Sequence, residues 1–419
     1  MNILFLADNF PPERNAMAAR VYERACYWVR WGHRVTVITC EPNFPEGKVF
    51  EGYRNQWHLV EEMSGIRVVR VKTYIAPNAG KYRRIVDALS YMIAAFAAGL
   101  FERRSDLIVA TSPQFFGALG GCVLAAVRRV PFVLELSDLW PDSVVAVGAM
   151  KRSFALHSLE KIELWMYRRA ARVVALTKAF KANLVRRGID AGKVGVVING
   201  VELSRYAPRE KDRQLARRLG LEEQHFVVGY IGTHGMAHAL ENVLGAAALD
   251  GDSDMRFLFV GGGAEQERLV AKAQRMGLRN VVFVPAQPKE TMPSYWSLCD
   301  VALVHLKDTP LFGTVIPSKI FEAMGMGLPI LLAAPKGEAS EILEESGAGL
   351  WVAPERPQEL LEAARLLKSN HQLTHGLASR SREAAHGYTR ERQAREMLAI
   401  LSEAANAMAE GKAASATAR

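Results

Sequence analysis

Short runs of apolar and β-branched residues recur along the chain, separated by amphipathic stretches long enough for helices. A first series comprises NILFLA (2–7), RVTVIT (34–39), RVVRV (67–71), DLIVAT (106–111), FVLEL (132–136), RVVAL (172–176) and VGVVI (194–198). A second series comprises HFVVGYIG (225–232), RFLFVGGG (256–263), NVVFV (280–284), DVALVHL (300–306), PILLAA (329–334) and GLWV (349–352). Strands that are apolar on both faces and alternate with helices are typical of parallel sheets covered on both sides. The sequence therefore predicts an α/β protein built from two doubly wound, Rossmann-like domains.

The length of 419 residues also favours two domains, because a single hydrophobic core rarely grows beyond about 250–300 residues. Strand signals stop in the charged stretch 198–224, so we expect an N-terminal domain over 1–205 and a C-terminal domain over 206–388. Segment 389–409 predicts a helix that packs back on the N-terminal domain, and the small polar residues of 410–419 predict a disordered tail. Ligands of open α/β sheets bind outside the carboxyl ends of strands, so we expect the site in a cleft between the two domains.

The formal net charge of +9 favours anionic partners, such as nucleic acid, a phosphorylated small molecule or an anionic membrane surface. The sequence has neither zinc-finger spacing nor an RNP motif, which argues against nucleic acid. Its four cysteines are scattered, without C-x-x-C pairs, as in proteins of the reducing cytoplasm. The first ten residues lack the charged start and long apolar run of a signal peptide, so we expect a cytoplasmic protein.

The stretch GTVIPSKIFEAMGMGLP (313–329) predicts a short helix that opens at Pro317, after a strand of the second domain. Lys319 and Glu322 are three residues apart and therefore neighbours on one face of that helix. The Lys319 ammonium and the amides of Ser318 and Lys319 at the helix start predict a diphosphate cradle. The Glu322 carboxylate suits the two vicinal hydroxyls of a ribose. The alternative is a solvated Lys319–Glu322 ion pair that binds no ligand.

A glycine turn follows the strand VVGYIG and contains Gly232, Thr233, His234 and Gly235. Such a turn before a helix presents amide groups to a phosphate, or it is only a tight connection. His234 and His238 have the H-x-x-x-H spacing of some metal sites, but no third ligand motif follows. We therefore expect no metal, and we expect His238 to be a polar side chain near the cleft.

The loop SDLWPDS (137–143) follows the strand FVLEL and groups Asp138, Trp140 and Asp142. An exposed tryptophan beside carboxylates suits sugar recognition, whereas a proline-bounded turn capped by Asp142 or Ser143 would be purely structural.

The apolar segment 81–104 is flanked by basic clusters. Its apolar run is short for a membrane span, so we expect a helix that is buried against the sheet or partly inserted in an anionic leaflet.

Seven motifs, in this order, resemble the GT-B glycosyltransferases of family 4, and in particular their WbuB-like branch from bacterial O-antigen and capsule biosynthesis. They are the PPE loop (11–13), WGHRVTVIT (31–39), SDLWPDS (137–143), VINGVE (197–202), YIG with its turn (230–235), PSKIFEAM (317–324) and GEASEI (337–342). The resemblance implies a hexosyltransferase whose C-terminal domain binds a nucleoside-diphosphate sugar and whose N-terminal domain binds the acceptor. It also implies retention of the anomeric configuration, with no obligatory metal or other cofactor.

The resemblance further assigns parts of the donor to residues of the C-terminal domain. It implies that Glu322 binds the ribose and that Ser318 and Lys319 bind the diphosphate. Main-chain groups around Pro285 to Gln287, after the strand NVVFV, would recognise the base.

The chain departs from the wider family at three places. The family has an E-x7-E motif whose first acid contacts the donor sugar, and here that position is Thr314. Where the family places Arg and Lys after the first strand of the C-terminal domain, this chain has Thr233 and His238; the lysine of the PSK motif can replace that charge. A histidine of the N-terminal domain corresponds to Ser137, so the acceptor-side role passes to Asp138.

These features together predict a retaining transferase for an N-acetylhexosamine or a deoxy-aminohexose, carried on UDP or another nucleoside diphosphate. The expected acceptor is an undecaprenyl-diphosphate-linked saccharide at the inner face of the cytoplasmic membrane, in lipopolysaccharide or exopolysaccharide biosynthesis. Two alternatives stay open: a non-hydrolysing UDP-sugar 2-epimerase, and a non-catalytic nucleotide-sugar-binding subunit.

Overall fold

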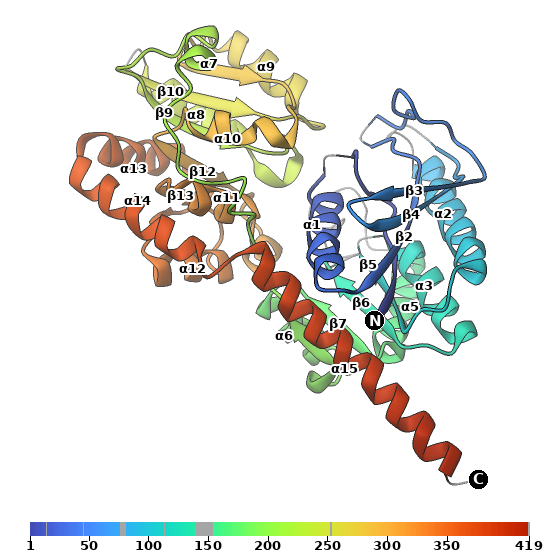
Figure 1. Cartoon of the computed structure of the whole chain (residues 1–419). Coiled ribbons are helices and arrows are strands. Elements are labelled where there is room, and N and C mark those ends of the chain that lie inside the picture. Colours follow the sequence, from blue (N-terminus) through green and yellow to red (C-terminus); the bar gives the residue numbers. More distant parts are fainter. Residues whose placement is uncertain are drawn as a thin grey trace. The chain divides into compact units, whose positions relative to one another are not determined.

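The computed structural model describes residues 1–13, 15–44, 46–75, 81–112, 114–139, 154–251 and 254–417. The chain forms two compact units (Figure 1). The first contains Met1–Ile198 and Glu391–Arg419, and the second contains Asn199–Arg390. Each unit is built on a single sheet, so the predicted fold class of two Rossmann-like α/β domains is confirmed.

The sheet of the first unit has the strand order β3-β4-β2-β1-β5-β6-β7-β8. Its strands are β1 (Asn2–Leu6), β2 (Arg34–Cys40), β3 (His58–Met63), β4 (Ile66–Val71), β5 (Leu107–Thr111), β6 (Phe132–Leu136), β7 (Arg172–Ala175) and β8 (Val194–Val196). All neighbouring strands are parallel except β3 and β4, which form an antiparallel pair. The sequence analysis missed β3 because this edge strand alternates exposed and half-buried side chains and has no continuous apolar run.

The helices of the first unit are α1 (Ala16–Arg30), α2 (Lys81–Phe101), α3 (Phe115–Arg128), α5 (Phe154–Arg169), α6 (Lys178–Arg186), η1 (Ala191–Lys193) and α15 (Arg390–Thr417). Asn15 caps α1, because its side-chain oxygen accepts a hydrogen bond from the Ala18 amide at 2.8 Å.

The long helix α15 completes the core of the first unit from the far end of the chain. Ala394, Met397 and Leu401 are fully buried in the same apolar cluster as Trp28 of α1. The Trp28 indole N–H donates to the Ala394 carbonyl at 2.9 Å. The helix continues to Thr417, so it runs through most of the segment 410–419 that the sequence predicted to be disordered.

The sheet of the second unit is parallel, with the order β11-β10-β9-β12-β13-β14. Its strands are β9 (Phe226–Ile231), β10 (Met255–Val260), β11 (Val281–Val284), β12 (Val301–His305), β13 (Ile330–Ala333) and β14 (Gly349–Val352). Its helices are α7 (Arg213–Arg218), η2 (Met236–His238), α8 (Glu241–Asp250), α9 (Gln266–Arg275), η3 (Lys289–Thr291), α10 (Met292–Trp296), η4 (Pro310–Thr314), α11 (Lys319–Met326), α12 (Glu338–Ser346), α13 (Pro357–Ser369) and α14 (His371–Ala385). Strand order reverses between β9 and β12, which is where ligands bind in folds of this type.

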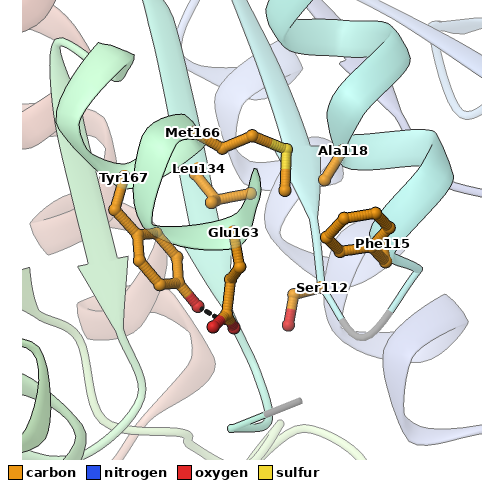
Figure 2. Close-up of a pocket in the computed structure, with 7 residues that line it drawn as sticks. All are labelled: Ser112, Phe115, Ala118, Leu134, Glu163, Met166 and Tyr167. Carbon is orange, nitrogen blue, oxygen red and sulfur yellow. Dashed lines mark hydrogen bonds between the residues drawn. The ribbon is translucent and has the colours of Figure 1, made fainter. Parts of the chain in front are cut away.

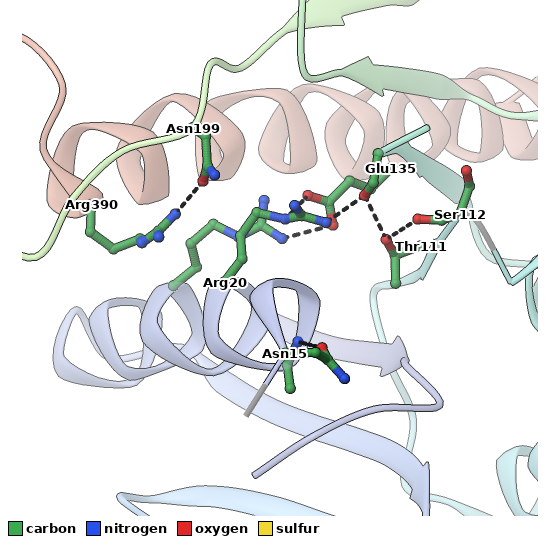
Figure 3. A network of polar contacts seen from close by, with 10 residues as sticks. Asn15, Arg20, Thr111, Ser112, Glu135, Asn199 and Arg390 are labelled. Carbon is green, nitrogen blue, oxygen red and sulfur yellow. Dashed lines mark hydrogen bonds and ion pairs between the residues drawn. The ribbon is translucent and has the colours of Figure 1, made fainter. Parts of the chain in front are cut away.

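The two units divide between Ile198 and Asn199, whereas the sequence placed the division between residues 205 and 206. The reason is local pairing between the two ends of the second unit. Val201 bridges Thr389, and the Arg390 guanidinium donates to the Asn199 side chain at 2.6 Å (Figure 3). These contacts hold residues after 198 to the second unit.

Candidate functional site

The centre of the site is a glycine turn at the carboxyl end of β9. Gly232 has a φ of +144°, a backbone conformation that residues other than glycine rarely adopt. A Cβ at this position would also lie 3.1 Å from the Lys319 Nζ. Gly261, at the end of β10, packs its backbone directly against the Gly232 carbonyl. Glycine is therefore required here both for conformation and for the close approach of the lysine.

Lys319, the first residue of α11, is buried beside this turn with its ammonium over the face of Tyr230. The Nζ lies 3.5 Å from the Tyr230 ring centroid and has no hydrogen-bond partner among the described residues. Burial lowers the pKa of Lys319 to about 7, although the nearby Glu322 acts in the opposite direction. A buried ammonium with no partner is costly, so this position favours an incoming anion.

Three histidines surround the lysine, and all three are held neutral. Burial, with the Lys319 charge second, lowers the pKa of His234 to about 4 and that of His238 to about 3. Burial likewise lowers the pKa of His305 to about 4. Both ring nitrogens of the fully buried His234, and the Nε2 of His305, are without a hydrogen-bond partner in the described part of the chain. These polar atoms gather where β9 and β12 end.

The structure shows where His238 of the H-x-x-x-H pair and the neighbouring His305 direct their ring nitrogens. His238 and His305 face each other's main chain: the His305 Nδ1 lies 2.8 Å from the His238 carbonyl, and the His238 Nδ1 lies 3.4 Å from the His305 carbonyl. Within the described residues, no group of three or more His, Cys, Asp or Glu side chains is placed to hold a metal ion. His238 therefore packs against the end of β12 and holds the glycine turn in place. The sequence analysis did not select the fully buried His234 as a residue of the site.

The start of α11 lies close to its predicted position. The helix begins at Lys319 rather than at Pro317, and its first hydrogen bonds run from the Ile320 amide to the Pro317 carbonyl and from the Phe321 amide to the Ser318 carbonyl. The amides of Ser318 and Lys319 thus precede the first helical hydrogen bond.

Glu322 is half-buried on the same helix, and its charge acts on Lys319.

The other residues that the sequence predicts to bind the nucleotide-sugar donor lie in loops of the second unit. Thr233 is exposed, and its carbonyl accepts the Tyr230 hydroxyl at 2.8 Å; the Gly235 carbonyl accepts the His238 amide at 3.0 Å. Thr314 ends η4, where its hydroxyl donates to the Leu311 carbonyl at 2.7 Å.

Pro285 and Gln287 follow β11 at the edge of the sheet. The Gln287 side-chain amide donates to the Pro285 carbonyl at 3.2 Å. Between them, the Ala286 side chain would lie 3.4 Å from a Cβ placed on Gly262, in the turn that ends β10. This loop is therefore adjacent to the glycine turns.

In the first unit, Asp138 follows β6 and is half-buried, and its carbonyl accepts the Ser112 hydroxyl at 3.1 Å. Trp140, Asp142 and Ser143, which the sequence grouped with it, lie outside the described residues. Asp138 keeps its acceptor-side role as a prediction.

A buried ion pair network is centred on Glu135 of β6 (Figure 3). Glu135 in β6 contacts Arg20 Nε at 3.1 Å and Arg24 Nη2 at 2.7 Å. Burial alone would raise the pKa of Glu135, but Arg24 and Arg20 together hold it below its usual range. Arg20 also donates to Ser137, whose hydroxyl lies 3.2 Å from that of Thr111. An acid inside the apolar run FVLEL was the sequence signal for this network.

A pair of carboxyl groups that the sequence analysis missed lies at the end of β1. Burial, and then the charge of Glu13, raises the pKa of Asp8 to about 7. Burial also raises the pKa of Glu13 to about 6, although the amides of Asn43 and Phe44 donate to it at 2.8 and 2.9 Å. Their position directly after a strand was the available signal.

The pocket drawn in Figure 2 is a small structural cavity of the first unit. Tyr167 donates to Glu163 at 2.6 Å, and Arg187 donates to the other Glu163 oxygen at 2.9 Å. Its volume of about 10 Å³ is near the minimum for one water molecule. It is too small for a sugar.

Two Rossmann-like units in one chain define the GT-B class of glycosyltransferase folds, and solved structures resemble the chain over almost its whole length. The sucrose-phosphate synthase of Thermosynechococcus elongatus is 18% identical, with a TM-score of 0.78, over 96% of this chain and 98% of that one. Anabaena Alr3699/HepE, solved with UDP and glucose, is 20% identical, with a TM-score of 0.73, over 96% of this chain and 99% of that one.

Sequence comparison gives the family. Residues 15–200 match the glycosyl transferase 4-like domain, and residues 211–384 match the glycosyl transferases group 1 domain. The putative colanic acid biosynthesis glycosyl transferase WcaI of Escherichia coli K12 is 26% identical over 387 residues, which are 87% of this chain and 91% of WcaI. The chain belongs to the glycosyltransferases that combine these two domains.

Proposed function

We propose that this protein transfers a sugar from a nucleoside-diphosphate sugar, bound by the second unit, to an acceptor in cell-envelope polysaccharide biosynthesis. The observation that carries the proposal is the Lys319 ammonium, which is buried against the Gly232 turn and has no hydrogen-bond partner in the part of the chain that the structure describes. A diphosphate supplies the anion that this ammonium lacks, and the neutral histidines around it add no repulsion toward one another or toward Lys319. The site also lies where strand order reverses, the usual ligand position of such sheets.

In this proposal the protein acts mainly by positioning and by charge stabilisation. Lys319 and the amides at the start of α11 stabilise the charge that develops on the departing diphosphate. Glu322 accepts from the ribose hydroxyls, the main chain near Pro285 and Gln287 contacts the base, and Thr314 faces the donor sugar. We expect retention of configuration and no requirement for a metal.

The acceptor and the pathway are proposed from the relatives. WcaI is named for colanic acid biosynthesis, and HepE was solved with UDP and glucose. They support a UDP-sugar donor and a role in envelope polysaccharide biosynthesis. From the resemblance of the sequence we further propose an N-acetylhexosamine or a deoxy-aminohexose as the sugar, and a saccharide linked to undecaprenyl diphosphate as the acceptor. The enzyme would work from the cytoplasmic side of the membrane.

The test begins with thermal-shift measurements of the full chain with UDP, GDP, dTDP and ADP sugars, followed by donor hydrolysis with the sugar that stabilises most. Lys319→Ala and Glu322→Ala should each abolish turnover. Lys336→Ala is the matched control, because Lys336 also stacks on an aromatic ring, that of Trp351 at 3.9 Å, but is exposed. Normal turnover in both site variants would refute the site.

The same samples separate the alternatives. Formation of the C2 epimer from UDP-N-acetylglucosamine alone, followed by NMR, would instead identify a 2-epimerase. Stabilisation by a nucleotide without turnover of any donor would identify a non-catalytic subunit.

A further inference from the structure

The outward face of α2 is an exposed apolar feature of the described chain that the proposed catalytic site does not use. Along this helix, residues at a spacing of four are buried against the unit: Tyr91, Ala95 and Gly99. On the opposite face, Ile93 is 64% exposed and Phe101 is 90% exposed. The helix therefore exposes a stripe of apolar side chains to solvent, where a surface helix normally has polar residues.

Helix α2 is fixed to the unit and is not available to span a bilayer. The Tyr91 hydroxyl donates to the Ile38 carbonyl of β2 at 2.9 Å. Arg128 of α3 donates to the carbonyls of Gly99 and Arg103, each at 2.6 Å, and so provides hydrogen bonds for carbonyl groups at the end of the helix. Segment Tyr82–Phe101 is the one described helix long and apolar enough to cross a membrane by length and composition. Leaving the unit would break these contacts and expose the sheet.

The charges around the stripe indicate what covers it. Arg83 and Arg84 at one end of α2, and Arg103 and Arg104 just beyond the other, are all exposed. Among the acids nearby, Glu102 forms a bidentate ion pair with Arg67 at 3.1 Å, and the Arg84 charge acts on Asp87, whose pKa burial raises to about 6.

Aromatic residues close both ends of the stripe, since Tyr82 is 84% exposed and Phe101 is 90% exposed. An apolar stripe with aromatic ends and flanking arginines matches the boundary between acyl chains and anionic headgroups.

We infer that the outward face of α2, from Tyr82 to Arg104, docks the protein on an anionic lipid bilayer, with the helix lying along the surface. Figure 1 shows α2 at the outer side of the first unit. The inference rests on the proposed function only in giving the enzyme access to a lipid-linked acceptor, because docking itself needs no substrate.

The experiment is flotation of the full chain with vesicles of phosphatidylcholine, alone or with 30% phosphatidylglycerol. The wild type should float with the anionic vesicles and much less with the neutral ones. Replacing Arg103 and Arg104 together by Gln should lower the partition coefficient by about 25-fold, at roughly fivefold per arginine. Ile93→Glu should abolish flotation, and Leu366→Glu, at a 46% exposed apolar position of α13, should not change it.

Several results would overturn the inference. They are absence of flotation in the wild type, equal flotation of wild type and Ile93→Glu, and a dimer in light scattering that Ile93→Glu dissolves, which would make the stripe a contact between copies. If alkaline carbonate does not extract the protein from the membrane, α2 would instead be a membrane-spanning helix. Donor binding by Ile93→Glu, measured in parallel, tests the proposed function separately.

Discussion

Donor binding should depend on pH through Lys319, and the direction follows from its surroundings. With a pKa of about 7 the lysine loses its charge as the pH rises above neutrality. A bound diphosphate favours the charged form and returns the pKa toward its ordinary value, so binding takes up a proton. Between pH 6 and pH 9 the affinity should therefore fall by about 100-fold, or ~2.7 kcal/mol.

The histidines and the tyrosine near Lys319 do not change their protonation between pH 6 and pH 9. The pKa values of His234 and His305 are lowered to about 4 and that of His238 to about 3, so all three stay neutral above pH 6. Burial raises the pKa of Tyr230 well above its usual value, so the phenol also stays neutral. A single titration with a midpoint near pH 7 is expected.

The assay is isothermal titration calorimetry at pH 6, 7, 8 and 9 with the nucleotide sugar that gives the largest thermal shift. At pH 8, two buffers of different ionisation enthalpy should report uptake of close to one proton. Lys319→Arg should remove the pH dependence, since arginine keeps its charge, and Lys319→Met should bind weakly at every pH. Lys336→Met should behave as the wild type. A wild-type affinity that is flat from pH 6 to pH 9 would refute the reasoning.

Three further predictions concern charged groups. Glu322→Gln should move the midpoint of that titration below pH 7, because the Glu322 charge raises the pKa of Lys319; an unmoved midpoint in calorimetry would contradict this. Asp8→Asn should gain stability relative to the wild type as the pH rises. The folded-state pKa of Asp8 is raised to about 7, so the stability that its protonated form contributes is lost between the unfolded pKa near 4 and pH 7. In urea unfolding the difference between the two proteins should grow by about 2 kcal/mol from pH 5.5 to 7.5, and a constant difference would disprove the assignment. Glu135→Gln should destabilise the first unit by about 3–5 kcal/mol in thermal or urea unfolding, because it leaves the fully buried Arg24 without its carboxylate; a loss under about 1 kcal/mol would mean that the pair is not essential.

The fold was predictable because parallel strands buried on both faces leave continuous apolar runs. The edge strand β3 was not, since its pairing with β4 depends on a neighbour and not on its own burial. The division of the units was misplaced for a similar reason: the pairing of Val201 with Thr389 joins residues far apart in sequence.

The site was predictable where spacing along one helix decides geometry, as for Lys319 and Glu322. It was not predictable where chemistry depends on burial. Nothing in the sequence distinguishes His234, which is fully buried beside the rings of Tyr230, Phe259 and Phe283, from an exposed histidine of a loop. Asp8 and Glu13 likewise become unusual only when folding removes them from water.

The return of α15 to the first unit makes that unit discontinuous in the chain, and this sets an order for its assembly. During synthesis the apolar cluster around Trp28 cannot be completed until residues 199–390 have been made, which takes on the order of 10–40 s at ~5–20 residues per second. Over that interval the apolar surface that Ala394, Met397 and Leu401 finally cover is exposed, whereas the second unit can already fold as a continuous segment. The nascent first unit is thus the part of this protein that most needs protection from aggregation.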